Sequence, residues 1–235
     1  MNYDQAVDCI VEAARLNESA IISCHAVHAV VTISSDTTLR EAVNRFAMVT
    51  PDGQPVRWAL NSLYGLRLED RVYGPELMWR TLAACERESK SVYLYGGSPQ
   101  SLERLSSNVR KAFPELEIAG RKSPPFRELS ETELQTIADE INSTAADVVF
   151  IGLGCPKQDQ FAAHQAERIN AVQICVGAAF DFHSDSKPMA PAWMQRNGLE
   201  WLFRLACEPR RLFSRYLTTN SIFIAKYLKA RLFRK

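Results

Sequence analysis

The sequence predicts an α/β fold in which helices cover both faces of a mostly parallel sheet. Short apolar segments alternate with helical segments through residue 176. Strands that are apolar throughout are typical of parallel sheets, because both faces of such a sheet are buried. Most of these apolar segments end at a turn containing glycine or proline. The chain has 235 residues, which is enough for one domain with a substantial core.

Three strand–helix pairs are predicted in the first half of the chain. Each predicted strand is an apolar run, and turn residues separate two of the strands from their helices: Pro51-Asp52-Gly53 and Gly96-Gly97. The expected pairs are 20–24 with a helix to about 35, 46–50 with a helix through 58, and 91–95 with a helix over 99–112.

The pattern continues to residue 176. Ser130 and Glu133 have the spacing of a capping box, which marks the start of a helix. A Gly154-Cys155-Pro156 turn separates the fifth strand from its helix. The expected elements are strands over 116–119, 147–153 and 172–176, and helices over 130–142 and from the turn to about 169.

The composition changes near residue 190. Residues 191–235 hold ten Lys or Arg and two acids, whereas residues 1–190 hold 18 Lys or Arg and 25 acids. The segment 193–235 has no strand pattern and predicts two or three amphipathic helices. We therefore expect a domain over 1–190 with a helical appendage over 191–235. The basic appendage indicates an anionic partner: a membrane surface, a phosphate-bearing ligand or nucleic acid.

The cysteines and the apolar segments indicate a cytoplasmic location. Six cysteines are scattered without a Cys-x-x-Cys pair, as in a reducing compartment. The chain starts without the apolar run of a secretory signal, and no stretch reaches the roughly 18–20 apolar residues of a membrane-spanning helix.

Loops that follow parallel strands are where such sheets bind ligands. Asp52 lies in one of them, between Pro51 and Gly53. A carboxylate there could take the proton of an attacking hydroxyl group in a sugar transfer. The alternative is that Asp52 only caps the helix that follows.

Two other loops could hold phosphate or sugar groups. In 152–158, helix-start amides and Lys157 could bind a phosphate, although the third glycine of the dinucleotide fingerprint is absent. Asp181 follows the last strand and could bind a ribose or sugar hydroxyl. A plain turn and a carboxylate satisfied by backbone amides are the respective alternatives.

A metal site is not expected. His25 and His28 are three residues apart without a visible third ligand, and Asp181 and Asp185 lack Asp-x-Asp spacing. The basic cluster Arg210, Arg211 and Arg215 stands beside aromatic residues. It suits a diphosphate or an anionic membrane surface, and a solvated helix face is the alternative.

Five ordered motifs give the chain its resemblance to a known family. They are Pro51-Asp52-Gly53-x-Pro55-Val56-x-Trp58, Arg71-Val72-Tyr73-Gly74-Pro75-Glu76-Leu77-Met78, Gly152-Leu153-Gly154-x-Pro156-Lys157-Gln158-Asp159, Gly177-x-x-Phe180-Asp181-Phe182, and Ala190-Pro191-x-Trp193-Met194-Gln195 running into Gly198-Leu199-Glu200-Trp201-Leu202-x-Arg204 and Glu208-Pro209-x-Arg211. With these motifs, the chain resembles the WecG/TagA/CpsF glycosyltransferase family, also called glycosyltransferase family 26.

The resemblance implies a Rossmann-like fold and an inverting, metal-independent transfer without a cofactor. The implied donor is a UDP-sugar, and the implied acceptor is a polyprenyl-diphosphate-linked sugar used for exopolysaccharide, teichoic acid or common antigen. Asp52 would be the catalytic base. The substrate-binding residues that we expect are Cys24, His28, Arg71, Gly96, Gly97, Gly154, Pro156, Lys157, Gln158, Asp181, Arg204, Arg211 and Arg215.

The resemblance also gives the appendage two roles, closing the active site and docking on the inner face of the cell membrane. It suggests a homo-oligomer and gives no role to nucleic acid. The chain departs from the family in one loop: Cys24 and Ala26 stand where the family usually has Thr and Asn, so Ser23, His25 or His28 could take over part of that role.

Two other classes of protein agree with parts of the sequence. One is an NAD-type oxidoreductase, which the missing third glycine and the lack of a suitably placed acidic residue disfavour. The other is a non-catalytic module that binds membranes or nucleic acid through the basic appendage, which leaves the strand-end loops without a role.

Overall fold

All six strands of the sheet are parallel, as predicted. The structure is a computed structural model that describes residues 1–233. The sheet has the order β2-β1-β6-β5-β3-β4. Its strands are β1 Ile21–His25, β2 Met48–Pro51, β3 Val92–Gly96, β4 Ile118–Lys122, β5 Val148–Gly152 and β6 Val172–Cys175.

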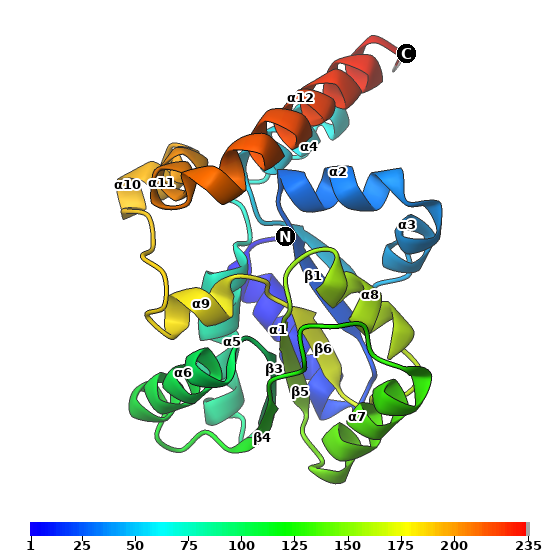
Figure 1. The fold of residues 1–235 in the computed structure, drawn as a ribbon, viewed down its shortest axis with the longest axis vertical. Helices are drawn as coiled ribbons and strands as arrows, with labels where there is room; N and C mark the ends of the chain where they lie inside the picture. The colour runs from blue at the N-terminus through cyan, green and yellow to red at the C-terminus, as the bar shows by residue number, and fades with distance from the viewer. Residues whose placement is uncertain (234–235) are drawn as a thin grey trace.

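Helices cover both faces of this sheet (Figure 1). Apolar side chains of α1, α5, α6 and α9 form a core with one face, and those of α7 and α8 form a core with the other. The helices up to residue 183 are α1 Tyr3–Arg15, α2 Val27–Ser35, α3 Thr37–Val43, α4 Gln54–Tyr64, α5 Gly74–Arg87, α6 Pro99–Ala112, α7 Glu131–Ser143, α8 Lys157–His164 and α9 Ala179–His183.

Several predicted bounds were wrong. Strand β4 occupies Ile118–Lys122 rather than 116–119. It is an edge strand, where solvent-facing charged residues such as Arg121 are tolerated. Helix α8 ends at His164, short of the predicted 169, and the buried Gln165 that follows donates its side-chain N–H to the Leu134 carbonyl. Helices α1, α3 and α5 were not predicted, and none of them directly follows a predicted strand.

The loops after β3 and β5 meet at a switch point of the sheet. The chain leaves β3 toward β4 and leaves β5 toward β6, in opposite directions across the sheet. Such a point is the usual ligand crevice of an open parallel sheet. A Cβ on Gly96, which has φ +132°, would lie 2.6 Å from the Gly152 carbonyl oxygen, so glycine is required for this close approach.

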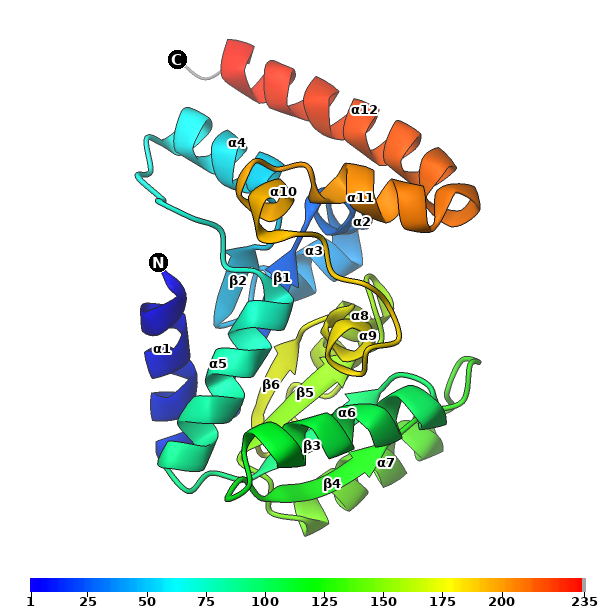
Figure 2. The ribbon, with the colours of Figure 1, turned by 90° about the vertical axis from the view of Figure 1, so that its left-hand side faces the viewer.

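The C-terminal segment forms three helices within the described residues, α10 Ala192–Arg196, α11 Glu200–Cys207 and α12 Pro209–Phe233. They lie over the carboxyl ends of β1 and β2 (Figure 2). Helix α12 packs along α2 and α4, where Lys226 Nζ donates to Ser34 Oγ at 2.6 Å and Ser62 Oγ lies 2.8 Å from Tyr227 Oη. The predicted helical appendage is therefore seated on the α/β domain.

Candidate active site

Asp52 stands directly after β2, at the carboxyl edge of the sheet. Its backbone N–H donates to the His25 carbonyl at 3.1 Å. Its Oδ1 accepts the N–H of Gly74, the first residue of α5, at 2.7 Å. The N-cap of the following helix α4 is Gly53, without a side-chain hydrogen bond. Asp52 therefore does not cap the helix that follows it, and its carboxylate faces the start of α5.

The surroundings of Asp52 raise its pKa to about 6. Burial is the largest cause, and the charge of Glu200 adds to it, while the Gly74 N–H, Arg71 and Arg204 act in the opposite direction. Asp52 is nevertheless partly exposed to solvent. A carboxylate with a pKa near neutrality is both ionised at pH 7 and basic enough to accept a proton from a hydroxyl group in a transition state.

A buried ion pair lies beside Asp52. Arg71 Nη2 donates to Glu200 Oε2 at 2.7 Å, and Tyr73 Oη donates to Glu200 Oε1 at 2.9 Å. Arg71 also lies 4.1 Å from the centre of the Tyr73 ring. Arg71 was expected at the site, whereas Tyr73 and Glu200 were not singled out, although both lie in the matched motifs. The guanidinium group of Arg71 is thus paired with the carboxylate of Glu200.

Gln158 shapes the loop after β5. Its side chain is 2% exposed, and its Oε1 accepts the Gly154 N–H at 3.1 Å. Gly177, after β6, would place a Cβ 3.6 Å from the same oxygen. Lys157 is exposed, and Pro156 is the N-cap of α8. The Gln158 side chain therefore braces the loop after β5 by its bond to Gly154 and lies close to Gly177 of the loop after β6.

The first strand is fixed to α8 by a buried group that sequence reasoning missed. Asp159 is fully buried, and its Oδ1 accepts from Ser23 Oγ at 2.6 Å and lies 3.0 Å from His25 Nε2. This contact engages Ser23 and His25, two of the three residues that were expected to take over part of the role of the usual Thr and Asn. The signal was present in the sequence, since Asp159 ends the matched motif around Gly154.

Cys24 of β1 and His28 of α2 lie at the same edge of the sheet as Asp52. The Cys24 Cβ would lie 3.6 Å from a Cβ on Gly74, and burial raises the pKa of the Cys24 thiol, which stays protonated. His28 is half-buried, and burial followed by the charge of Arg215 lowers its pKa. The imidazole is therefore neutral at pH 7 and can accept or donate a hydrogen bond.

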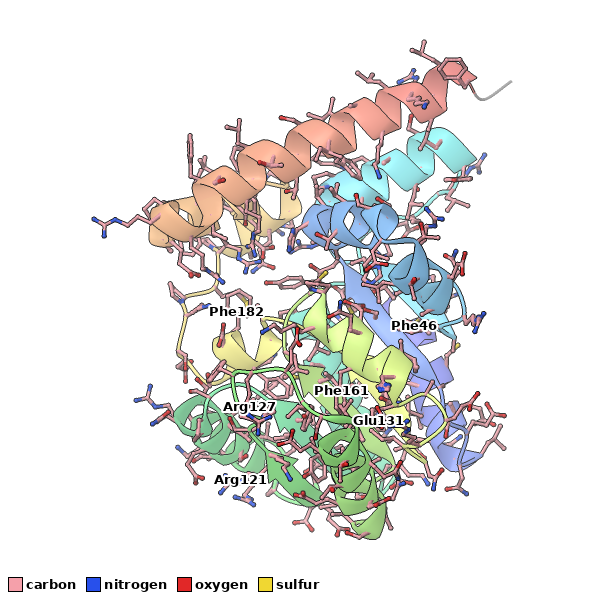
Figure 3. The ribbon with its side chains drawn as sticks, turned by 45° about the vertical axis from the view of Figure 1, so that its right-hand side comes forward. Phe46, Arg121, Arg127, Glu131, Phe161 and Phe182 are labelled. Atoms are coloured by element: carbon pink, nitrogen blue, oxygen red, sulfur yellow. The ribbon has the colours of Figure 1, made fainter. Side chains whose placement is uncertain are left out.

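Two arginines from the appendage reach the site. The Arg204 guanidinium lies 5.6 Å from the centre of the Phe182 ring, which projects between α9 and the C-terminal helices (Figure 3). Burial lowers the pKa of Arg215, and the charges of Arg211 and Arg204 add to that effect. The Nε of Arg215 is buried without a hydrogen-bond partner. Like charges held together in this way favour an anionic ligand.

Two further predicted residues, Arg211 and Asp181, are held in ion pairs. Arg211 is exposed and pairs with Glu208 at 2.6 Å, and Asp181 pairs with Lys187 at 2.7 Å. An open cleft of about 810 Å³ between α5, α6 and α9 is lined by residues that include Lys187 and Phe182 but not Asp52. In this arrangement the structure groups Asp52, Arg71 and Arg204, with Arg215 near His28, and leaves Arg211 and Asp181 outside the group.

Within residues 1–233, no three His, Cys, Asp or Glu side chains gather in a way that would hold a metal ion. In the same part of the chain, no helix combines the length and the apolar character needed to span a bilayer.

The fold is an open, parallel α/β sheet of the class that binds ligands at the carboxyl ends of its strands. The chain matches the Glycosyl transferase WecG/TagA/CpsF family over residues 1–235 and belongs to this family.

Two relatives are named N-acetylglucosaminyldiphosphoundecaprenol N-acetyl-beta-D-mannosaminyltransferase. The protein of Bacillus spizizenii (strain ATCC 23059 / NRRL B-14472 / W23) is 31% identical over 165 residues, which is 69% of this chain and 62% of the relative. That of Bacillus subtilis (strain 168) is 29% identical over 164 residues, with the same two shares. The chain therefore aligns with less than two thirds of the length of these curated relatives.

Proposed function

We propose that the protein is a glycosyltransferase that moves a sugar from a UDP-sugar to a polyprenyl-diphosphate-linked sugar, for a cell-surface polysaccharide. Membership of the family supports the reaction class. The names of the two Bacillus relatives specify a diphosphoundecaprenol acceptor and a β-linked product, which supports a lipid-linked acceptor here. The identity of the donor sugar does not follow from those names.

The observation that carries the proposal is Asp52, with a pKa of about 6 at the carboxyl edge of the sheet. In the proposed step, the acceptor hydroxyl oxygen attacks the anomeric carbon and gives its proton to Asp52. The bond between that carbon and the diphosphate breaks, and UDP leaves with the electron pair. Attack from the face opposite UDP inverts the configuration and forms the β-linkage.

The diphosphate needs positive charge as UDP leaves. We assign this role to Arg204 and Arg215, with the backbone amides at the start of α8 as further donors. Arg71 forms an ion pair with Glu200. We therefore assign it a supporting role beside Asp52 and not a contact with the diphosphate. No metal ion is assigned a role in this proposal, because the arginines supply the charge that a metal would otherwise bring.

The appendage also has the character of a membrane-docking helix. Its basic residues suit an anionic inner leaflet, where each one adds about 1 kcal/mol. Several large apolar side chains of α12 are exposed at spacings of four and seven residues, which places them on one helix face. They are Phe213, Leu217, Ile224 and Leu228. We infer that this face lies in the inner surface of the cell membrane, where a lipid-linked acceptor is found.

Ligand-induced thermal stabilisation tests the donor class. UDP at a hundred times its dissociation constant should stabilise the protein by about 2.7 kcal/mol, whereas NAD should leave the melting temperature unchanged. Stabilisation by NAD and not by UDP would favour an oxidoreductase and contradict the proposal. The activity test is a screen of UDP-sugars with a synthetic polyprenyl-diphosphate sugar, with the products read by mass spectrometry.

Arg204→Ala should weaken UDP binding about tenfold or more, because it removes a charged contact to the diphosphate. The matched control is Arg196→Ala, a loss of the same charge at an exposed position of α10. Isothermal titration with UDP measures both. Equal affinities of the two variants would remove Arg204 from the diphosphate site.

A further inference from the structure

Glu200 is a buried acid that links the C-terminal helices to the α/β domain. It is the first residue of α11 and is 8% exposed. Both of its carboxylate oxygens are used, by Arg71 at 2.7 Å and by Tyr73 at 2.9 Å. A buried carboxylate is costly unless its partners are well placed, and both partners here come from the segment before α5. This makes the contact specific for one seated position of α11.

The segment 71–74, which contains both partners of Glu200, also contacts Asp52. The Val72 N–H donates to the Pro51 carbonyl at 3.1 Å, and Thr50 Oγ1 donates to the Val72 carbonyl at 3.2 Å. Gly74 then gives its N–H to Asp52 Oδ1 at 2.7 Å. The residues on either side of Val72 are the two that Glu200 binds. A shift of Arg71 or Tyr73 would therefore displace the Gly74 N–H, which donates to the Asp52 carboxylate.

There is little free space to absorb such a shift. A Cβ at Gly74 would lie 3.0 Å from the Val176 carbonyl oxygen and 3.4 Å from Asp52 Oδ1. Gln195 of α10 adds a second contact to Arg71, between its Oε1 and Nη2 at 3.4 Å. The C-terminal helices thus fix Arg71 from two sides.

Glu200 also acts on Asp52 through its charge. It raises the pKa of Asp52, whereas Arg71 and Arg204 lower it. By pairing with Arg71, Glu200 offsets part of the positive charge that would otherwise weaken the base. The titratable and charged groups that act on Asp52 from the neighbouring elements are Cys24, Arg71, Tyr73, Glu200 and Arg204.

We propose that Glu200 is a positioning residue that couples the seating of the C-terminal helices to the formation of the base at Asp52. The inference rests on the proposed role of Asp52 in the transfer. When α11 is seated, the segment 71–74 is pinned and its Gly74 N–H orients the carboxylate. When α11 is displaced, Arg71 loses its acidic partner, and both the orientation and the basicity of Asp52 change.

The test is Glu200→Gln in the full chain, which keeps an acceptor for Tyr73 but removes the charge. The acid limb of the kcat profile reports the pKa of the base in the substrate complex. Since the negative charge of Glu200 raises that pKa, its removal should move the limb to lower pH, by about half a unit or more. We expect kcat to fall about tenfold, with the KM for the UDP-sugar within about twofold.

The matched control is Glu69→Gln, which removes the same charge from an exposed side chain close to Arg71 in the sequence. Its pH profile should equal that of the unchanged protein. A profile of Glu200→Gln that equals it as well would overturn the proposal.

Two further measurements keep the test decisive if Glu200→Gln folds poorly. Tyr73→Phe removes one hydrogen bond and no charge, and should lower kcat about fivefold at constant KM; an unchanged kcat would count against the coupling. Carboxyl-carbon NMR of the full chain follows the titration of Asp52 directly, with the signal assigned by comparison with Asp52→Asn. The midpoint of this titration should lie at lower pH in Glu200→Gln, and an unchanged midpoint would overturn the proposal. Failure of the proposed function is recognised separately, by full activity of Asp52→Asn.

Discussion

Asp52→Asn should lower the transfer rate by about a hundred- to ten-thousandfold while UDP binds with unchanged affinity. Asn is close in shape and can still accept the Gly74 N–H, but it cannot take the proton of the acceptor hydroxyl. Initial rates with a polyprenyl-diphosphate sugar measure the first effect, and titration with UDP measures the second. The rate of the unchanged protein should fall as the pH drops through about 6, because protonation removes the base.

The control is Asp139→Asn, which makes the same change at an exposed position of α7 and should leave the rate unchanged. Protein stability separates a catalytic defect from misfolding. Burial raises the folded-state pKa of Asp52, so its ionisation opposes folding once the pH exceeds its unfolded pKa. Asp52→Asn should therefore melt no earlier than the unchanged protein at pH 8. Full activity of this variant with its lipid-linked acceptor would remove Asp52 as the base.

Leu217→Gln combined with Ile224→Gln should weaken binding to anionic vesicles by about thirtyfold or more. The estimate takes roughly 1 kcal/mol of lost transfer free energy for each side chain, below the value for full burial. The two residues are 63% and 55% exposed on α12, so their replacement should not disturb the protein interior. Co-sedimentation with vesicles measures the effect. Activity on the lipid-linked acceptor should fall with it, while UDP binding stays constant.

A matched pair of exposed apolar residues elsewhere provides the control. Leu16 and Phe126 are 58% and 86% exposed and lie outside the C-terminal helices. Replacing both with Gln removes a similar apolar surface and should leave vesicle binding unchanged. If the two double variants lose binding equally, or if neither does, α12 is not the docking element.

Predictions from the sequence worked best where the signal is local. The apolar runs gave the parallel sheet, and the break near residue 190 gave the helical appendage, because both depend on composition within a short window. Helices α1, α3 and α5 were not predicted, because none of them directly follows an apolar, strand-like run. The capping box of α1, formed by Asn2 and Gln5, was a start signal that the sequence contained.

The sequence by itself determined the fold class, the strand-end position of Asp52 and the basic character of the appendage. Only the tertiary structure decided which groups meet there. Glu200 lies 129 residues after Arg71 in the chain, yet the two side chains form the pair beside Asp52. Burial and charges from distant segments set the pKa of a carboxylate, so the basicity of Asp52 could be derived only after those segments had been placed around it.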